Sequence, residues 1–361
     1  ANGGLLPESF NTYNIVEADD IIIRPTDLQN DKRSLRTGLV KEHGIITSAY
    51  IDLCPIKHVD SRYFHYLLHA YDVMKVFYNM GNGVRQGLNY SEFSKLMVFE
   101  PSYAEQVSIA DFLDAKCAEI DALTVDIQMQ IDTLEQYKRS VITEAVTKGL
   151  NPDVEMKDSG LKWIGKIPSS WNVMPNKYLM KKKKVICPVY KGEDILSLTM
   201  KGVIVRDLDA GGKMPTSFDG YQRLEPGNLL MCLFDIDVTP RCIGLIKQAG
   251  LSSPAYSQFE LNDMGNADYY CYYYTMLDND KTLLHLAKNL RHSLTEDQLG
   301  AISVIVPPVQ EQKRIANFLD AKCEEIDKVI AAKIEQLALI DEYKKSLIYE
   351  YVTGKKEVPA I

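Results

Sequence analysis

The sequence has 361 residues, of which 46% are hydrophobic and 25% charged, with a formal net charge of −8 at pH 7. This composition indicates two or more folded domains and excludes a disordered or collagen-like chain. No apolar run approaches the roughly 18 to 20 residues of a membrane span, and the seven scattered cysteines form no CxxC pair. We therefore expect a cytoplasmic protein with reduced cysteines, no bound metal and no membrane partner.

Residues 1–104 form the first globular region in chain order. Its short apolar stretches alternate with turn residues, which is typical of a domain of mixed helices and strands. His65 and His69 stand four residues apart on a possible helix. Their aromatic-rich surroundings favour a packing role over metal binding.

Residues 105–148 are predicted to form one long helix. Apolar residues recur at steps of three, four or seven, the spacing of a helix packed against a partner helix. Neither Pro nor Gly interrupts residues 105–147, and Pro101 precedes them. These 43 residues would extend about 64 Å. The predicted helix-pairing or subunit-interface residues are Ile109, Leu113, Ile120, Leu123, Ile127 and Leu134.

Residues 149–310 are predicted to form a second α+β domain. A Gly-Leu-Asn-Pro turn ends the preceding helix, and β-rich runs such as NLLMCLF (residues 228–234) follow. The segment PDVEMK (residues 152–157) superficially resembles the PD and ExK elements of restriction nucleases. In those nucleases separate parts of the fold bring the acids around one metal, so we interpret these crowded acids as solvated linker charge.

Residues 311–354 repeat the first long helix, and residues 355–361 form a tail. Residues 311–353 align without a gap on residues 105–147 at an offset of 206, and 21 of the 43 pairs are identical. Chance does not give that similarity. The matching interface residues are Ile315, Leu319, Ile326, Val329, Ile340 and Leu347.

The repeat also extends upstream of the helices. Arg85 matches Arg291 at the same offset, and further back the offset becomes 208, where Ser9 aligns with Ser217. A two-residue difference in one loop is therefore predicted. The second copy begins with about fifty residues, from Asp158 to about Asp207, that match nothing in the first. We expect the first domain to be incomplete at its N-terminus.

The order is thus domain, long helix, domain, long helix. Two such copies form a pseudo-twofold arrangement if the helices pair antiparallel. The predicted fold class is α+β, with two globular domains held at opposite ends of an antiparallel coiled coil.

Four motifs carry a family resemblance: LKWIGKIPSSWNV (residues 161–173), SPAY (253–256), RHSL (291–294) and PPVQEQKRIANFLDAKCEEID (307–327). Together they resemble the specificity subunit of type I restriction-modification systems. The match spans essentially the whole chain and departs from the family pattern in two places. The first WIGKIP-type segment is lacking, and TSAY (residues 47–50) replaces the first SPAY.

The resemblance implies a non-catalytic subunit with two target recognition domains, each reading one half of a bipartite double-stranded DNA target. It implies that the paired helices fix the spacer and dock two methyltransferase subunits, through which restriction subunits join. No cofactor is then expected on this chain, while S-adenosylmethionine and ATP with Mg²⁺ are expected on the partner subunits. A rigid helix pair suits this role because half-sites a set number of base pairs apart require recognition surfaces at a fixed distance.

DNA contacts require cations for phosphates and side chains such as Arg, Asn or Gln for base edges. Two turns at equivalent positions of the repeat offer such groups. The alternative interpretation of these two turns is that they cap helices and leave an arginine in solvent. Loops in both domains offer additional cations, for each of which a solvated charge is the alternative. The predicted DNA-contacting residues are Arg85, Gln86, Asn89, Arg291, His292 and Thr295 in the turns, and Lys32, Arg33, Arg36, Lys201, Arg206, Lys213 and Arg241 in the loops.

Catalytic signatures were sought as an alternative to recognition. Neither an NPPY-type methyltransferase motif nor a Walker A loop occurs in the sequence, which disfavours a self-sufficient nuclease or methyltransferase. A second hypothesis remains: a coiled-coil scaffold that positions two protein-binding domains and never reads DNA. The feature that distinguishes the two hypotheses is the basic and amide-bearing turn that is repeated in both domains. DNA recognition uses such a turn, whereas a protein-binding scaffold does not require it.

Overall fold

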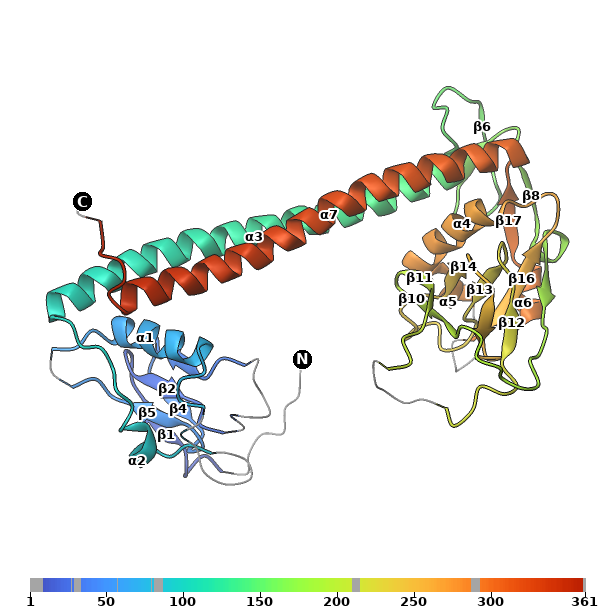
Figure 1. Ribbon diagram of the computed structural model, residues 1–361. Helices are drawn as coiled ribbons and strands as arrows, with labels where there is room; N and C mark the ends of the chain where they lie inside the picture. The colour runs from blue at the N-terminus through green and yellow to red at the C-terminus, as the bar shows by residue number, and fades with distance from the viewer. Residues whose placement is uncertain are drawn as a thin grey trace. The chain divides into compact units, whose positions relative to one another are not determined.

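The computed structural model describes residues 9–26, 28, 34–56, 58–78, 80, 87–209, 215–286 and 293–359. The chain divides into two compact units. The N-terminal unit comprises Ala1–Ile131 and Ala332–Ile361, and the central unit comprises Asp132–Ala331. Both boundaries fall inside the long helices, so each unit contains one globular domain and part of each helix (Figure 1).

Both predicted long helices are present. Helix α3 spans Tyr103–Lys148 and helix α7 spans Val309–Val352. Each begins two residues before its predicted start, directly after the proline-containing turn. Gly149, with a φ of 78°, follows α3. That left-handed conformation favours glycine and is the usual way in which a helix ends.

The two helices pair antiparallel. In the N-terminal unit, the rings of Phe112 and Tyr351 lie 4.5 Å apart. Further along α3, Asp121 Oδ1 accepts a hydrogen bond of 2.5 Å from Lys344 Nζ, which lies earlier on α7. Residue numbers therefore rise on one helix as they fall on the other.

The central unit contains the repeat equivalent of this ion pair. Lys138 Nζ lies 2.6 Å from Asp327 Oδ2, and both residues are 206 positions from the members of the first pair. Most of the predicted interface residues are buried: Ile109, Leu113, Ile120, Ile127, Ile315, Leu319, Ile326 and Leu347. Leu134 and Ile340 are partly buried. Leu123 and Val329 are 45% and 42% exposed, so they do not pack in the seam.

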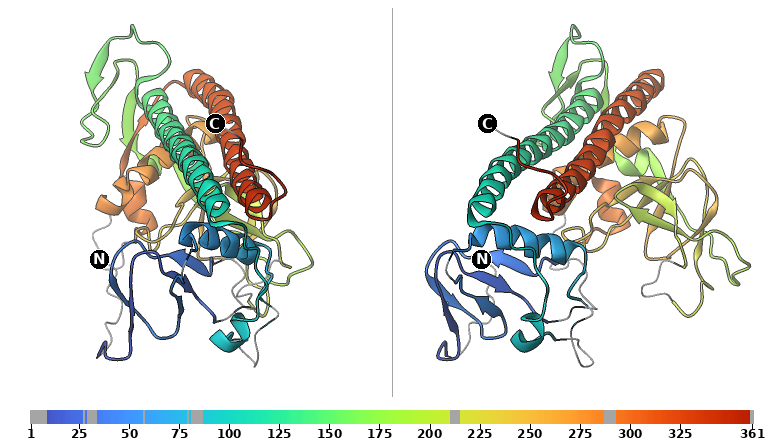
Figure 2. Two further views of the ribbon diagram at one scale, coloured as in Figure 1. Left: turned by 90° about the vertical axis from the view of Figure 1, so that its left-hand side faces the viewer. Right: turned by 60° about the vertical axis from the view of Figure 1, so that its left-hand side comes forward.

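The globular part of the N-terminal unit packs short antiparallel strands against one helix. The strands are β1 (Asn14–Val16), β2 (Ile21–Ile23), β3 (Thr37–Leu39), β4 (Gly44–Ile46) and β5 (Ile51–Leu53). They form a sheet in the order β3-β2-β5 and a separate pair β1-β4. Helices α1 (Ser61–Val73) and α2 (Tyr90–Phe93) follow. The core joins α1 to the adjoining ends of α3 and α7 (Figure 2).

The central unit contains the same arrangement and additional strands. Its elements are β6 (Met156–Asp158), β7 (Lys166–Pro168), β8 (Asn172–Pro175), η1 (Asn176–Tyr178), β9 (Met180–Lys183), β10 (Leu196–Thr199), β11 (Gly202–Val205), β12 (Gln222–Leu224), β13 (Leu229–Met231), β14 (Ile243–Leu245), β15 (Gly250–Ser252), β16 (Ser257–Leu261), α4 (Ala267–Asn279), α5 (Thr282–Leu286), α6 (Glu296–Ala301) and β17 (Ser303–Val306). The main sheet runs β14-β13-β16-β9, with the pairs β12-β15, β10-β11, β17-β8 and β6-β7 beside it.

The two units match strand for strand. The order β3-β2-β5 corresponds to β14-β13-β16, and the pair β1-β4 corresponds to β12-β15. Strands β12 and β13 lie 208 residues after β1 and β2, whereas the later elements that have an equivalent lie 206 residues after it. The predicted two-residue difference therefore lies between β2 and β3. Residues 24–36 connect these strands in the first copy, and residues 232–242 connect β13 and β14 in the second.

A buried glutamine fixes the start of each long helix. Gln106 Oε1 accepts a hydrogen bond of 2.9 Å from the backbone N–H of Asp60, the residue that caps α1. At the equivalent place, Gln312 Oε1 accepts one of 2.7 Å from the backbone N–H of Asn266, which caps α4. Both amide groups also donate to the carbonyl of the preceding proline turn. One side chain thereby ties the helix to its domain in both copies.

Candidate nucleic-acid interface

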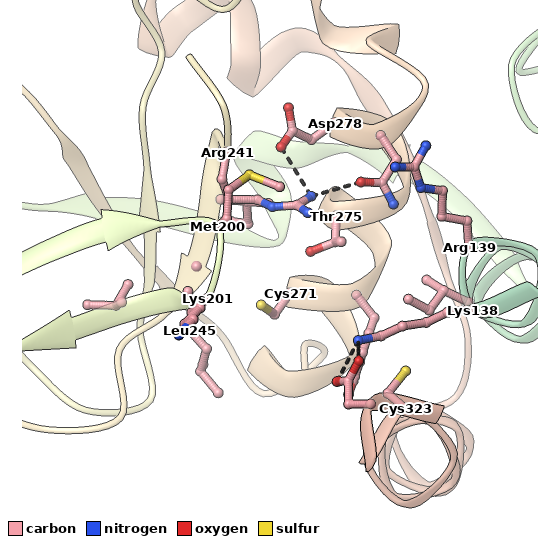
Figure 3. A pocket seen from close by; sticks show the side chains of 18 of the residues that line it. Lys138, Arg139, Met200, Lys201, Arg241, Leu245, Cys271, Thr275, Asp278 and Cys323 are labelled. Carbon is pink, nitrogen blue, oxygen red and sulfur yellow. Dashed lines mark hydrogen bonds and ion pairs between the residues drawn. The ribbon is translucent and has the colours of Figure 1, made fainter. Parts of the chain in front are cut away.

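A groove of about 1010 Å³ crosses the central unit between its long helices and its globular domain. Lys138 and Arg139 of α3 and Asp327 of α7 line one wall. The other wall comes from the β10–β11 hairpin, β14 and α4, and carries Lys201 and Arg241 (Figure 3). Segments that are distant in sequence thus line one hollow, which is called the groove from here on.

Six cations line the groove: Lys138, Arg139, Lys201, Arg241, Lys247 and Lys281. Three are partly buried and paired with acids, Lys138 with Asp327 and both Arg241 and Lys281 with Asp278.

The other three cations, Arg139, Lys201 and Lys247, are exposed. Within the described part of the chain they make no ion pair. Six acidic side chains also line the groove, so its charge is mixed: Glu135, Asp268, Asp278, Asp320, Glu324 and Asp327. The cations available to an external anion are the exposed ones.

Asp278 organises the inner end of the groove. Its buried carboxylate accepts hydrogen bonds from the backbone N–H of Cys242 at 3.0 Å, from Arg241 Nη1 at 3.3 Å and from Lys281 Nζ at 3.2 Å. A buried carboxylate is tolerated only with such partners. Burial and the Asp278 charge raise the pKa of the Cys242 thiol to about 12, so this thiol stays protonated at neutral pH.

The N-terminal unit repeats this arrangement with Asp72, which explains the position of Arg36. Asp72 is buried and accepts hydrogen bonds from the backbone N–H of Arg36 at 2.5 Å and from the hydroxyl of Tyr78 at 2.9 Å. The Arg36 guanidinium is buried as well and donates to the carbonyl oxygen of Thr26. Arg36 was expected at the DNA surface, but here it supports the interior of the domain.

Asn89 and Thr295 are helix caps at repeat-equivalent positions. Asn89 Oδ1 accepts a 3.0 Å hydrogen bond from the backbone N–H of Glu92, and Thr295 Oγ1 accepts one of 3.1 Å from that of Gln298. The Glu92 and Gln298 side chains accept in return from the two cap residues, which completes a capping box at each site. The capping alternative therefore accounts for both side-chain oxygens.

The remaining predicted DNA-contacting residues fall into three sets: groove-lining residues, Arg206, and residues outside the described part of the chain. Lys201 and Arg241 line the groove. Arg206 follows β11, and its backbone N–H donates to the carbonyl of Ile195. Burial raises the pKa of Tyr256, and the positive charge of Arg206 acts in the opposite direction and lowers it. The others lie outside the described residues: Lys32, Arg33, Arg85, Gln86, Lys213, Arg291 and His292.

Sequence reasoning missed four of the lining cations, namely Lys138, Arg139, Lys247 and Lys281. Lys138 and Arg139 belong to the tetrapeptide YKRS, which recurs as YKKS at residues 343–346. This repeated pair of cations was the signal in the sequence from which the two lining residues could have been predicted. It was hidden because the helical periodicity marks both positions only as solvent-facing.

One cluster in the N-terminal unit differs in chemistry from its counterpart. Oxygen and sulfur atoms of Asp20, Asp52 and Cys54 lie within 4.8 Å of one another, and Asp52 Oδ1 is buried without a hydrogen-bond partner. Burial, followed by the Asp20 charge, raises the pKa of Asp52. The equivalent residues of the central unit, Asn228 and Gln258, are neutral amides that hydrogen-bond to each other at 3.3 Å.

Comparisons with known proteins agree with this fold. Residues 253–336 match the family model of the type I restriction modification DNA specificity domain. The chain is 25% identical over 317 residues to a protein of Methanocaldococcus jannaschii that is described as the MjaX specificity subunit of a type I restriction enzyme. That match covers 83% of this chain and 69% of the relative.

Solved structures extend the comparison. A chain from a study of complex assembly and conformational transition of the type I R-M system superposes with a TM-score of 0.71 at 12% identity, covering 96% of this chain and 84% of its own. The HsdS subunit of Thermoanaerobacter tengcongensis is also 12% identical, with a TM-score of 0.49 and coverage of 98% and 84%. None of the described helices combines the length and apolar character of a membrane span. The predicted resemblance is confirmed: the chain is similar to type I restriction-modification specificity subunits.

Proposed function

We propose that this chain is the DNA-recognition subunit of a type I restriction-modification complex and reads a bipartite, asymmetric target. Each unit would read one half-site, and the antiparallel helices would set the spacer between them. The observation that carries this proposal is the repeat of one fold in both units, together with three exposed cations in the mixed-charge groove of the central unit. Equivalent folds give each unit a recognition surface, and their unlike loops give each a different half-site.

The exposed cations of the groove support DNA as the ligand. Three segments of the chain supply these cations to one surface: helix α3 carries Arg139, the β10–β11 turn carries Lys201, and the segment after β14 carries Lys247. Phosphate contacts of this kind position a duplex without reading its sequence. A pure protein scaffold requires no such set.

The helices also present apolar residues that pairing does not use. Leu123 and Tyr343 are exposed in the N-terminal unit, and their repeat equivalents Val329 and Tyr137 are exposed in the central unit. In each unit the pairing register places the two residues at about the same level of the helix pair. Exposed apolar residues in repeated positions fit a partner that binds twice, and we assign them to two methyltransferase subunits.

The chemistry of the complex would then reside on its partners. The chain would bind no cofactor itself, S-adenosylmethionine would bind to the methyltransferase subunits, and ATP with Mg²⁺ would bind to restriction subunits that join through them. Because the complex acts on intracellular DNA, we expect it in the cytoplasm.

The decisive experiment is co-expression of the chain with its cognate methyltransferase subunit, followed by single-molecule sequencing to map methylated adenines. An asymmetric two-part motif with a fixed gap is the expected result, and exchanging one unit for that of a relative should change one half of the motif. A stable complex with active methyltransferase but without new methylation would favour the scaffold hypothesis.

A further inference from the structure

A second hollow, of about 430 Å³, adjoins the groove in the central unit. We call it the apolar pocket, because its walls include Leu198, Met200, Phe234, Val238 and Tyr256. Met200 and Arg241 line both the pocket and the groove. The groove and the apolar pocket therefore adjoin at these side chains.

The pocket exposes large apolar side chains beside positive charge. Val238 is 73% exposed and Met200 60%, while the neighbouring Lys201 at the hairpin turn is exposed as well. Apolar groups left in solvent in this way mark contact surfaces. Their combination with cations fits a polyanion that also carries apolar groups.

The β13–β14 loop, residues 232–242, holds the pocket in shape. The backbone N–H of Asp235 donates to Ser293 Oγ at 3.3 Å, and Lys281 Nζ donates to the carbonyl of Thr239 at 3.3 Å. The side chains of Phe234 and Tyr256 stack with centroids 6.1 Å apart. A surface fixed before binding loses little conformational freedom on contact.

The same loop is where the two repeats diverge in length. Eleven residues connect β13 and β14, whereas thirteen connect the equivalent β2 and β3. The other equivalent elements keep their register. A loop that lines the pocket and differs between otherwise matching units is the natural place for the two half-sites to be distinguished.

We infer that the apolar pocket reads the 5-methyl group of thymine in the half-site bound by the central unit, an inference that rests on the proposed DNA-recognition function. In the major groove, the thymine methyl is the apolar feature that distinguishes base-pair edges. Phe234, Val238 and Met200 offer contact to such a group. Arg241 Nη1 is already held by Asp278 and Asn279, so that donor does not compete for guanine.

The test uses the full chain and duplexes selected by it from a pool with a randomised core. Each thymine of the selected sequence is then replaced singly by deoxyuridine, which lacks only the 5-methyl group. We expect a loss of affinity of about fourfold at one or two thymines of one half-site, the ratio that corresponds to one buried carbon. The other thymines should tolerate the change.

Variants connect that discrimination to the pocket. Val238→Ala removes two methyl groups at a mostly exposed position and should abolish the difference between thymine and deoxyuridine. Val189→Ala is the matched control, because Val189 is 57% exposed and does not line the pocket; it should preserve the difference. Phe234→Leu provides a second pocket variant, which keeps an apolar side chain but removes the ring.

Three results would overturn the inference while leaving DNA recognition intact. They are a selected half-site without thymine, specific binding in which every thymine tolerates deoxyuridine, and unchanged discrimination in both pocket variants. Selection of no sequence at all by the wild-type chain would instead overturn the proposed function, and the inference with it.

Discussion

Residues 97–100 of the N-terminal unit and strand β17 of the central unit occupy equivalent positions, yet only β17 is covered. Val304 and Ile305 of β17 are fully buried because β8 pairs with them. Their equivalents Val98 and Phe99 are 42% and 53% exposed, and no strand among the described residues pairs with them. The layer that β8 adds to the central unit thus has no counterpart among the described residues of the N-terminal unit.

The uncovered face extends across the small strand pair. Leu251 in β15 is buried against Cys187 and Ile195, which belong to the segment that precedes β10. Its equivalent, Ile45, is 53% exposed. The five common strands, α1 or α4, and the adjoining helix ends thus form the shared core. In the central unit, β8 and β9 cover this core by pairing with β17 and β16.

The largest effect should come from a charge placed in the helix seam. Ile326→Lys in the central unit or the equivalent Ile120→Lys in the N-terminal unit introduces an unpaired buried charge, with an expected loss of about 3 to 5 kcal/mol. Hydrogen exchange followed by mass spectrometry should report faster exchange mainly in the mutated unit. Val329→Lys, at an exposed position, is the control. Equal loss of protection in both units would mean that they do not unfold separately.

The glutamines at the helix starts allow a closer comparison. Among the described residues, the Gln312 side chain makes three hydrogen bonds, to Asn266, Met264 and Pro307, whereas the Gln106 side chain makes two. Because each lost partner leaves a buried group unsatisfied, Gln312→Ala should cost about 2 to 3 kcal/mol and Gln106→Ala about 1 kcal/mol less. Urea unfolding of each variant measures the difference. A larger cost for Gln106→Ala would contradict this account.

The groove cations distinguish recognition from a scaffold. Arg139→Ala and Lys247→Ala should each weaken DNA binding to a similar degree on all sequences and lower the slope of log K against log salt by about 0.9. Fluorescence anisotropy over a salt series measures this slope. Lys162→Ala, which changes a lysine outside the groove, is the control. Unchanged slopes in both groove variants would remove the groove from the interface.

The smallest effect concerns the acidic cluster of the N-terminal unit. The pKa of Asp52 is raised, so the folded unit holds this proton more tightly than the unfolded chain. The protonated Asp52 carboxyl therefore contributes stability in full below the pKa that Asp52 has in the unfolded chain. This contribution is lost as the pH rises through the pKa that Asp52 has in the folded unit. Asp52→Asn should therefore stabilise the unit at pH 7 by on the order of 1 kcal/mol.

That gain should shrink as pH falls toward 4, because the wild-type carboxyl then carries its proton. Urea unfolding at both pH values tests the trend, with the exposed Glu42→Gln as a control in the same unit. A gain independent of pH would show that the charge of Asp52 is not the cause.

The repeat, the long helices and their apolar seam could be predicted from the sequence, because a 43-residue match and helical periodicity are local signals. The groove could not, since it forms only when α3 and the β10–β11 hairpin meet in space. Arg36 illustrates the same limit. As a loop cation it resembled a DNA contact, but the fold places it beside Asp72 and Tyr78 in the interior.

The ion pairs between the long helices have a consequence for a half-length protein. Lys344 and Asp327 are the repeat equivalents of Lys138 and Asp121, and α7 carries both of them. Two copies of α7 laid antiparallel could therefore form Lys344–Asp327 bridges in both directions, as α3 and α7 now form Lys344–Asp121 and Lys138–Asp327. A single domain with its helix contains the seam in self-complementary form, so the duplicated chain can be regarded as a covalently linked homodimer.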